Sequence, residues 1–85
     1  QNFSRYVNDN QVLKAVAEFF SLPLEDLVGR SRKKEVVEPR QIAMYLLRDI
    51  LNMSYPYIGE KFNRDHTTAI HSFEKINREV SKTLL

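Results

Sequence analysis

Hydrogen-bonding side chains are concentrated in residues 62–76, which read FNRDHTTAIHSFEKI. An aspartate, a histidine and two threonines stand together at residues 65–68, and a second histidine follows at position 71. Side chains of these types can hold a metal ion, move a proton in catalysis, or exchange hydrogen bonds with another molecule. The spacing of these residues, and the element that carries them, decide among the three.

A metal site is poorly supported by the spacing. Two histidines that ligate one metal from the same helix are usually four residues apart. His66 and His71 are five apart and diverge by about 140° on a helix. Asp65 offers a third ligand, but the chain has no cysteine and no second pair of carboxylates beside it. We expect neither a structural nor a catalytic metal.

Catalysis is supported no better. Asp65 and His66 are neighbours in sequence, which does not make them a pair in space, and no nucleophile is clearly placed beside them. The chain also lacks GxxxxGK[ST], the pattern that cradles nucleotide phosphates. We therefore expect no enzymatic activity and no cofactor in this domain.

The polar stretch begins the last of several expected helices. Only two glycines occur and apolar residues recur at helical spacing, which predicts an all-α domain. Pro39 is suited to open a central, largely buried helix, and Ser54 to cap a short one. That short helix, a tight turn at residues 63–65 and a longer helix from about His66 have the outline of a helix-turn-helix.

Length and composition fit one small domain. The 85 residues, 42% hydrophobic and 28% charged, suffice for one modest core. Two further helices are expected within residues 8–20 and 22–29, with residues 1–8 as the end of a linker or connecting helix and residues 9–85 as the domain. No apolar run approaches the roughly 18 residues that a membrane span needs. The lack of an initiator methionine predicts a piece of a longer protein.

Charge is unevenly distributed along the chain. Residues 1–28 hold two basic and four acidic side chains, whereas residues 29–85 hold eleven basic and seven acidic ones. The densest basic stretch is GRSRKKEVVEPR at residues 29–40. Such a stretch is either a contact for a polyanion or a solvated loop, and composition alone leaves both open.

A helical wheel of the last helix, drawn at about 100° per residue, separates two faces. The core face holds Ala69, Phe73, Ile76, Val80 and Leu84, and the outer face holds Thr67, His71, Glu74, Lys75 and Arg78. The polar groups can read nucleic acid, because a carboxylate accepts from cytosine, a threonine methyl packs on the thymine methyl, and imidazole bonds base edges. For Asp65, capping of the helix and a base contact stand equally.

The stretch IGEKFNRDHTTAIHSFEKI closely resembles the signature of the bacterial chromosomal replication initiator family, DnaA, whose C-terminal domain binds DNA. The resemblance extends through RKKEVVEPRQIAMYLLRDI, SYPYIG and the first helix, and covers roughly residues 10–80. It implies about six helices that recognise short boxes of double-stranded DNA at the replication origin, for initiation and regulation of replication. It also implies a cytoplasmic location at the nucleoid, and a longer parent that is an ATPase and self-assembles through other domains.

The resemblance implies contacts for individual residues. Major-groove contacts are implied for Asp65, His66, Thr67, Thr68, His71 and Pro56, and a minor-groove contact for Arg32. Contacts to the DNA backbone are implied for Arg30, Lys33, Lys34, Arg40, Gln41, Arg48 and Tyr55. Family members commonly have two glycines before RDHTT, whereas FNRDHTT is one residue shorter and has none. Asn63 tolerates a left-handed conformation better than most residues, so a tight turn is still expected.

Two other functions remain open. The chain is alternatively a helix-turn-helix transcriptional regulator, or a helical protein-interaction module whose basic stretch meets an acidic partner. Repressors of the first kind usually dimerise on palindromic half-sites, and we find no spare apolar face that demands a dimer. A DNA reader loses affinity steeply with salt and with scrambling of its site, whereas an interaction module binds DNA negligibly.

Overall fold

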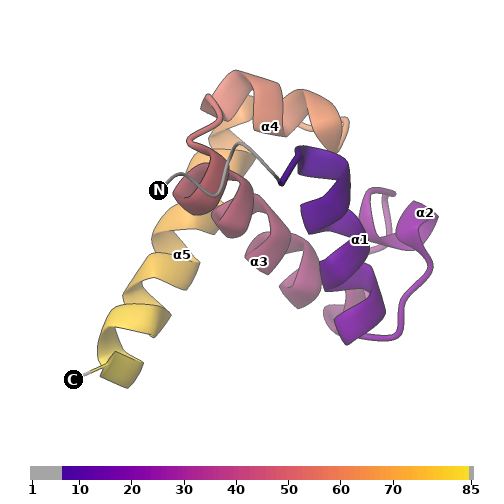
Figure 1. The fold of residues 1–85 in the computed structure, drawn as a ribbon, viewed down its shortest axis with the longest axis horizontal. Coiled ribbons are helices and arrows are strands. Elements are labelled where there is room, and N and C mark those ends of the chain that lie inside the picture. The colour runs from indigo at the N-terminus through magenta and orange to yellow at the C-terminus, as the bar shows by residue number, and fades with distance from the viewer. Residues whose placement is uncertain (1–6, 85) are drawn as a thin grey trace.

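The protein, described here by a computed structural model over residues 7–84, consists of helices joined by short loops (Figure 1). In order these are α1 (Asp9–Phe19), α2 (Leu24–Leu27), α3 (Lys34–Leu51), α4 (Tyr55–Lys61) and α5 (His66–Leu84). The all-α prediction is confirmed, although the described residues form five helices where about six were expected. Of the predicted linker, residues 1–6 lie outside the described part, and Val7 and Asn8 lead directly into α1.

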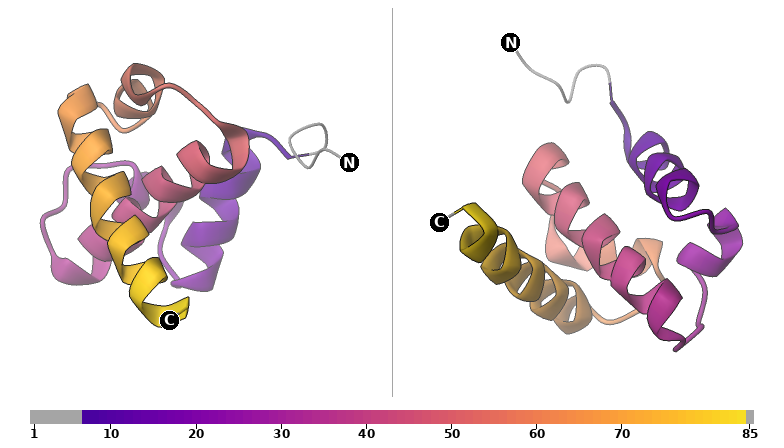
Figure 2. Two further views of the ribbon diagram at one scale, coloured as in Figure 1. Left: turned by 90° about the vertical axis from the view of Figure 1, so that its left-hand side faces the viewer. Right: turned by 90° about the horizontal axis from the view of Figure 1, so that it is seen from below.

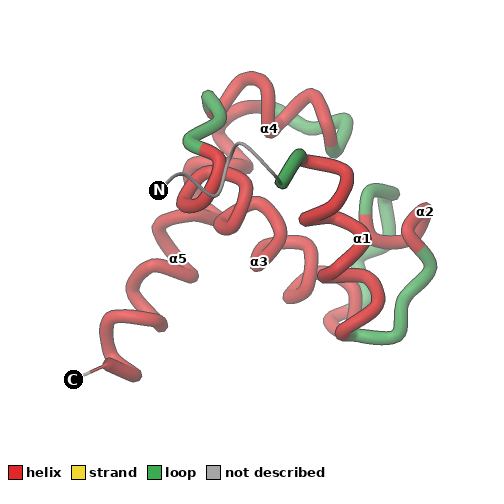
Figure 3. The backbone as a smooth tube through the Cα atoms, in the orientation of Figure 1, coloured by secondary structure: helices red, strands yellow, loops and turns green. Residues whose placement is uncertain are grey.

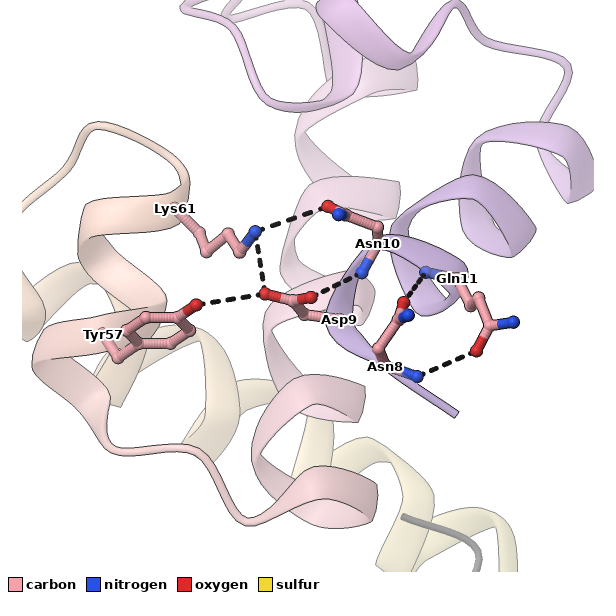
Figure 4. Close-up of polar contacts among 6 residues, drawn as sticks. All are labelled: Asn8, Asp9, Asn10, Gln11, Tyr57 and Lys61. Atoms are coloured by element: carbon pink, nitrogen blue, oxygen red, sulfur yellow. Dashed lines mark hydrogen bonds and ion pairs between the residues drawn. The ribbon is translucent and has the colours of Figure 1, made fainter. Parts of the chain in front are cut away.

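α1 begins with a reciprocal cap. The side-chain oxygen of Asn8 accepts a hydrogen bond from the Gln11 amide at 2.9 Å, and that of Gln11 accepts one from the Asn8 amide at 2.9 Å (Figure 4). The two bonds satisfy amides that a helix start otherwise leaves without partners. The buried face of α1 consists of Val12, Leu13, Val16 and Ala17.

α1 ends in a left-handed residue. Ser21 has a φ of 57°, and the Leu22 amide donates to the Ala17 carbonyl at 2.8 Å, which closes the end of the helix. Because the helix stops at Phe19, the following Phe20 does not continue the buried face and is 36% exposed. At helical spacing Phe20 would share the face of Val16, and the end of α1 at Phe19 is what removes it from that face.

Exposed apolar side chains form a groove that the sequence did not lead us to expect. Phe19 is 80% exposed and packs edge-on against Phe20, with ring centres 5.0 Å apart. The groove beside them is lined by Ala15, Val16, Phe19, Phe20, Ile42 and Leu46. Its lining residues come from the end of α1 and from α3.

α3 is the central helix, as its apolar circumference predicts. It contacts each of the other four helices, and it lies between α1 and α5 in Figure 2. Ala43, Met44 and Leu47 of α3 are fully buried. The core that they share with the other helices is completed by Leu27, Ile58, Phe62 and Ala69 together with the buried face of α1.

α3 begins well before Pro39, which was expected to open it. The amides of Val36 and Val37 both donate to the Lys33 carbonyl, at 2.9 and 2.8 Å, and so start the helix earlier. Pro39 has no amide, which removes one helical bond in the second turn, but its ring is buried there. The basic stretch is thereby divided, because residues 30–33 form a loop and the remainder lies in α3.

α4 starts at the predicted cap. The Ser54 hydroxyl oxygen accepts a hydrogen bond from the Tyr57 amide at 3.3 Å, and a proline stands in the first turn. Ile58 and Phe62 point inward and are fully buried, as their spacing predicts. α4 therefore packs as the first helix of a helix-turn-helix should, with α5 following after a short turn.

A polar cluster joins α4 to the start of α1. Nζ of Lys61 lies 2.7 Å from Oδ2 of Asp9, and the Tyr57 hydroxyl donates to the same oxygen at 3.3 Å (Figure 4). The bond from Lys61, above all, holds the pKa of Asp9 below its ordinary value. The cluster thus fixes the outer side of α4 to the residue that opens the domain.

Candidate nucleic-acid interface

The turn that precedes α5 closes without glycine. Asn63 has a φ of 59°, which is the left-handed conformation expected for it. The Arg64 amide donates to the Gly59 carbonyl at 2.8 Å, and the Asn63 amide to the Glu60 carbonyl at 3.1 Å. These two bonds form a Schellman closure of α4. A single asparagine therefore turns the chain between the two helices.

This turn lies directly against α4 at Gly59. A methyl group on Gly59 would stand 2.7 Å from the carbonyl oxygen of Arg64 and 3.1 Å from that of Asp65. Only glycine leaves room for this approach. We did not select Gly59 from the sequence, although a glycine inside a helix costs about 1 kcal/mol relative to alanine and so signals a special role.

α5 divides into the two faces that its spacing predicts. The exposed polar side chains at its start and along its outer face are His66, Thr67, His71, Glu74 and Arg78. The buried side chains on the opposite face are Ala69, Ser72 and Ile76. Thr68, Phe73, Lys75 and Val80 are half-buried, and the side chain of Leu84 lies outside the described part. The predicted orientation of the polar group is confirmed.

Asp65 organises its polar neighbours. Its Oδ2 accepts a hydrogen bond from the Thr67 hydroxyl at 2.7 Å, and its Oδ1 lies 3.3 Å from Nδ1 of His66. The bond from Thr67, above all, holds the pKa of Asp65 below its ordinary value. The carbonyl oxygen of Asp65 accepts from the Thr68 amide at 3.0 Å. An ionised carboxylate therefore stands exposed at the start of α5.

Asp65 and His66, whose adjacency in sequence did not by itself imply a pair, are in contact in the structure. The arrangement is nevertheless not that of a catalytic triad. In a triad the hydroxyl is bonded to the imidazole, which takes its proton. Here the Thr67 hydroxyl is bonded to the carboxylate instead, so the histidine is not placed as its base.

Residues 7–84 lack two further features. No three side chains of histidine, aspartate, glutamate or cysteine gather there as a metal ion would require. No helix in the same residues is long and apolar enough to cross a membrane.

Residues 30–33, the second part of the loop between α2 and α3, carry exposed positive charge and are named the basic loop. Its exposed cations are Arg30, Arg32 and Lys33. The Ser31 hydroxyl oxygen accepts a hydrogen bond from the Lys33 amide at 3.2 Å, which turns the loop. Lys34 follows as the exposed first residue of α3, and its Nζ lies 3.8 Å from Glu38. An exposed pair of this kind contributes little and leaves the local surface basic.

Arg40, predicted to contact the DNA backbone, is buried in the fold. It is 4% exposed. Its Nε donates to the Leu27 carbonyl at 2.7 Å. Its Nη1 donates to the backbone carbonyl of Ser31 at 2.8 Å, and its Nη2 to the backbone carbonyl of Asp26 at 3.0 Å. Burial lowers the pKa of Arg40, although an arginine stays charged. Because Arg40 offers almost no surface to a phosphate, we correct the predicted contact to a role inside the fold.

Arg48 and Tyr55 lie together where α3 ends and α4 begins. The guanidinium carbon of Arg48 is 4.5 Å from the centre of the Tyr55 ring, a cation–π contact, and its Nη1 donates to the Met53 carbonyl at 2.9 Å. Both side chains are half-buried, as is Gln41, and Pro56 is exposed. Each therefore keeps some surface for a ligand, and the contacts predicted at these positions stay predictions.

Arg64 was not among the predicted site residues, although it belongs to the RDHTT motif. Its Nη2 donates to the Gly29 carbonyl at 3.0 Å. The bond ties the turn before α5 to the residue that precedes the basic loop. In the sequence, this arginine resembles any exposed cation, and no pattern indicates a partner so far along the chain.

The chain is similar to known proteins along most of its length. The family described as bacterial dnaA protein helix-turn-helix matches residues 10–76. The chain is 42% identical over 81 residues to the chromosomal replication initiator protein DnaA of Thermoanaerobacter sp. (strain X514). It is 52% identical over 67 residues to the protein of that name from Lacticaseibacillus casei (strain BL23). These alignments cover 95% and 78% of the chain, but only 18% and 15% of the two relatives.

Proposed function

Because the chain belongs to the bacterial DnaA helix-turn-helix family, we propose that it binds double-stranded DNA sequence-specifically. The sites would be short boxes at the replication origin, and binding there would serve initiation and regulation of chromosome replication. The observation that supports this most is the exposed group of hydrogen-bonding side chains at the start of α5. α4 and the turn at Asn63 carry that group outward, where the major groove receives the second helix of a helix-turn-helix.

The major groove suits this group chemically. The ionised Asp65 accepts from the amino group of cytosine, and the methyls of Thr67 and Thr68 pack against the thymine methyl. His66 and His71 donate to or accept from base edges. The bond from Thr67 to Asp65 orients the carboxylate before DNA binds, which reduces the entropy lost on binding.

The remaining contacts divide between the minor groove and the backbone. We assign Arg32 of the basic loop to a narrow, A·T-rich minor groove, whose negative potential attracts arginine. Pro56 belongs with the major-groove group and adds an apolar contact there. The proposed backbone contacts are Arg30, Lys33, Lys34, Gln41, Arg48 and Tyr55. Arg40 is left out because of its burial.

The chain spans less than a fifth of the length of these relatives, so the activity of the whole protein is a separate proposal. We propose a parent that is an ATPase through an upstream domain and that self-assembles on the origin through other domains. Its place would be the nucleoid, in the cytoplasm, because its proposed ligand is chromosomal DNA. This domain would contribute binding and no catalytic step, with no cofactor of its own.

Binding of the chain to box-containing and scrambled duplexes over a series of salt concentrations tests the proposal. We expect the box to be preferred by roughly 10³-fold or more, with the logarithm of affinity falling linearly as the logarithm of salt rises. An interaction module would bind both duplexes equally weakly. A dimeric regulator would bind a palindromic pair of boxes cooperatively and a single box poorly.

A further inference from the structure

Two arginines from separate parts of the fold hold the segment that leads into the basic loop. Arg40 of α3 donates to three backbone carbonyls, those of Asp26, Leu27 and Ser31. Arg64, in the turn before α5, donates to a fourth, that of Gly29. Residues 26–31 are therefore held to α3 on one side and to the helix-turn-helix on the other.

The bond from Arg64 links the two surfaces proposed to meet DNA. Arg64 directly precedes Asp65, and Gly29 directly precedes the basic loop. The bond therefore runs from the start of the recognition helix, α5, to the start of the basic loop. The segment before α3 and the turn between α4 and α5 lie on the same side of the molecule (Figures 1 and 3).

This arrangement is not the one that stability alone favours. Nε of Arg64 is buried and has no hydrogen-bond partner among the described residues, and a buried unpaired donor is destabilising. The like charges of Arg40 and Arg64 are also close enough to repel. The carbonyls at the end of α2 carry partial negative charge and offset part of this cost. The bonds of the two arginines to residues 26–31 hold the start of the basic loop in place.

We propose that Arg64, supported by Arg40, is a positioning residue that fixes the basic loop relative to α5. Minor-groove insertion by Arg32 and major-groove reading by α5 then occur on one duplex at one spacing. The protein would select DNA in which the box and an A·T-rich flank lie a set distance apart. The inference rests on the proposed function, because it presupposes that both surfaces bind the same DNA.

A spacing experiment tests this with the whole chain. Four duplexes are compared: a box with an A·T flank, the same box with a G·C flank, the box with a single base pair inserted before the A·T flank, and a scrambled box. An insertion shifts the flank by about 3.4 Å and rotates it by about 35°. For the wild type we expect the insertion to remove the advantage of the A·T flank.

Arg64→Gln removes the link and is the informative variant. We expect the ratio of its affinities for the A·T-flanked and G·C-flanked duplexes to fall towards one. Its affinities for the inserted and uninserted duplexes should become equal. Its preference for the box over the scrambled duplex should stay within about twofold of the wild-type value. Amide exchange at residues 30–33 should become faster without DNA, because the loop loses a constraint. Arg64→Lys keeps the charge but not the planar fork, and should change the same quantities less.

Lys33→Gln is the matched control, since it removes one cation from the basic loop and leaves the link intact. It should lower the affinity for every duplex by the same factor, and the affinity should still depend on the spacing between box and flank. The inference is overturned if Arg64→Gln behaves like this control, which would make Arg64 a phosphate contact. It is equally overturned if Arg64→Gln keeps the spacing dependence, or loses box preference alone. A wild type that ignores the box would instead overturn the proposed function, and the inference with it.

Discussion

Gly59 and Arg64 meet across the turn between α4 and α5, where a methyl group on the glycine would stand 2.7 Å from the arginine's carbonyl oxygen. The Arg64 amide also donates to the Gly59 carbonyl at 2.8 Å. This close approach sets how far the start of α5 lies from α4. The orientation of α5 relative to α4 therefore depends on the absence of a Cβ atom at position 59.

Replacing Gly59 with alanine tests this contact. Alanine has the better helix propensity by about 1 kcal/mol, yet we expect Gly59→Ala to lower the free energy of unfolding by about 1–3 kcal/mol because the turn must move away. Box preference should fall with it. Urea unfolding and duplex binding measure both effects. Glu60→Ala, at the exposed next position, should stay within about 0.5 kcal/mol of wild type; a more stable Gly59→Ala would contradict the contact.

Asn63 allows a second test of the turn. Its φ of 59° suits glycine and opposes β-branched residues. We expect Asn63→Gly to keep or raise the free energy of unfolding, and Asn63→Val to lower it by about 1–2 kcal/mol. Thermal unfolding measures the difference. Box preference of Asn63→Gly should equal that of wild type, and a large loss there would mean that the asparagine side chain itself contacts DNA.

The division between base and phosphate contacts predicts unequal effects of two substitutions. His71→Ala removes an exposed group on the outer face of α5 and should reduce discrimination at one base pair by about 1–3 kcal/mol. Lys33→Ala should weaken all duplexes similarly and reduce the salt slope by about one. Titrations against singly substituted boxes give both numbers. If Lys33→Ala changed base preference while His71→Ala did not, the division would be wrong.

Asp9 predicts an acid dependence of stability. Its pKa in the folded chain lies below the ordinary value of 3.8, chiefly through the bond from Lys61. A lowered carboxylate pKa stabilises the fold above the unfolded value, and this stabilisation is lost as pH falls through the folded one. We expect Asp9→Asn to cost about 1–2 kcal/mol at neutral pH. The difference from wild type should begin to shrink near pH 3.8.

Urea unfolding from pH 7 downwards measures this difference. Glu18→Gln, an exposed acid on the same helix, should show no comparable convergence with wild type. A gap between wild type and Asp9→Asn that stayed constant through the acid range would mean that Asp9 contributes through packing rather than charge.

Much of the fold could be read from local patterns. The cap at Ser54, the two faces of α5 and the left-handed Asn63 all depend on neighbours within a few residues. Periodicity and capping preferences act over that range, so the sequence alone shows them. The exposed polar group at the start of α5 belongs with these, because its exposure follows from the buried residues of the same helix.

The start of α3 shows where a local preference failed. Proline favours the first turn of a helix, yet α3 accommodates Pro39 in its second turn with the ring buried. Burial of that ring offsets one missing hydrogen bond, and such burial has no signature in the neighbouring residues. Residues 34–38, which precede the proline and were expected to form a loop, are therefore helical.

The sequence by itself determined most of the helices, the turn before α5 and the polar group that α5 displays, since these follow from interactions within one element. The tertiary structure decided the roles of the arginines. Arg40 and Arg64 look alike as cations in the sequence, but their long side chains bond to carbonyls 9 to 35 residues away. Only the packing of α2, α3 and the turn brings those carbonyls within reach. The tertiary structure therefore separates these two arginines, which hold the fold together, from the exposed ones that we propose to meet DNA.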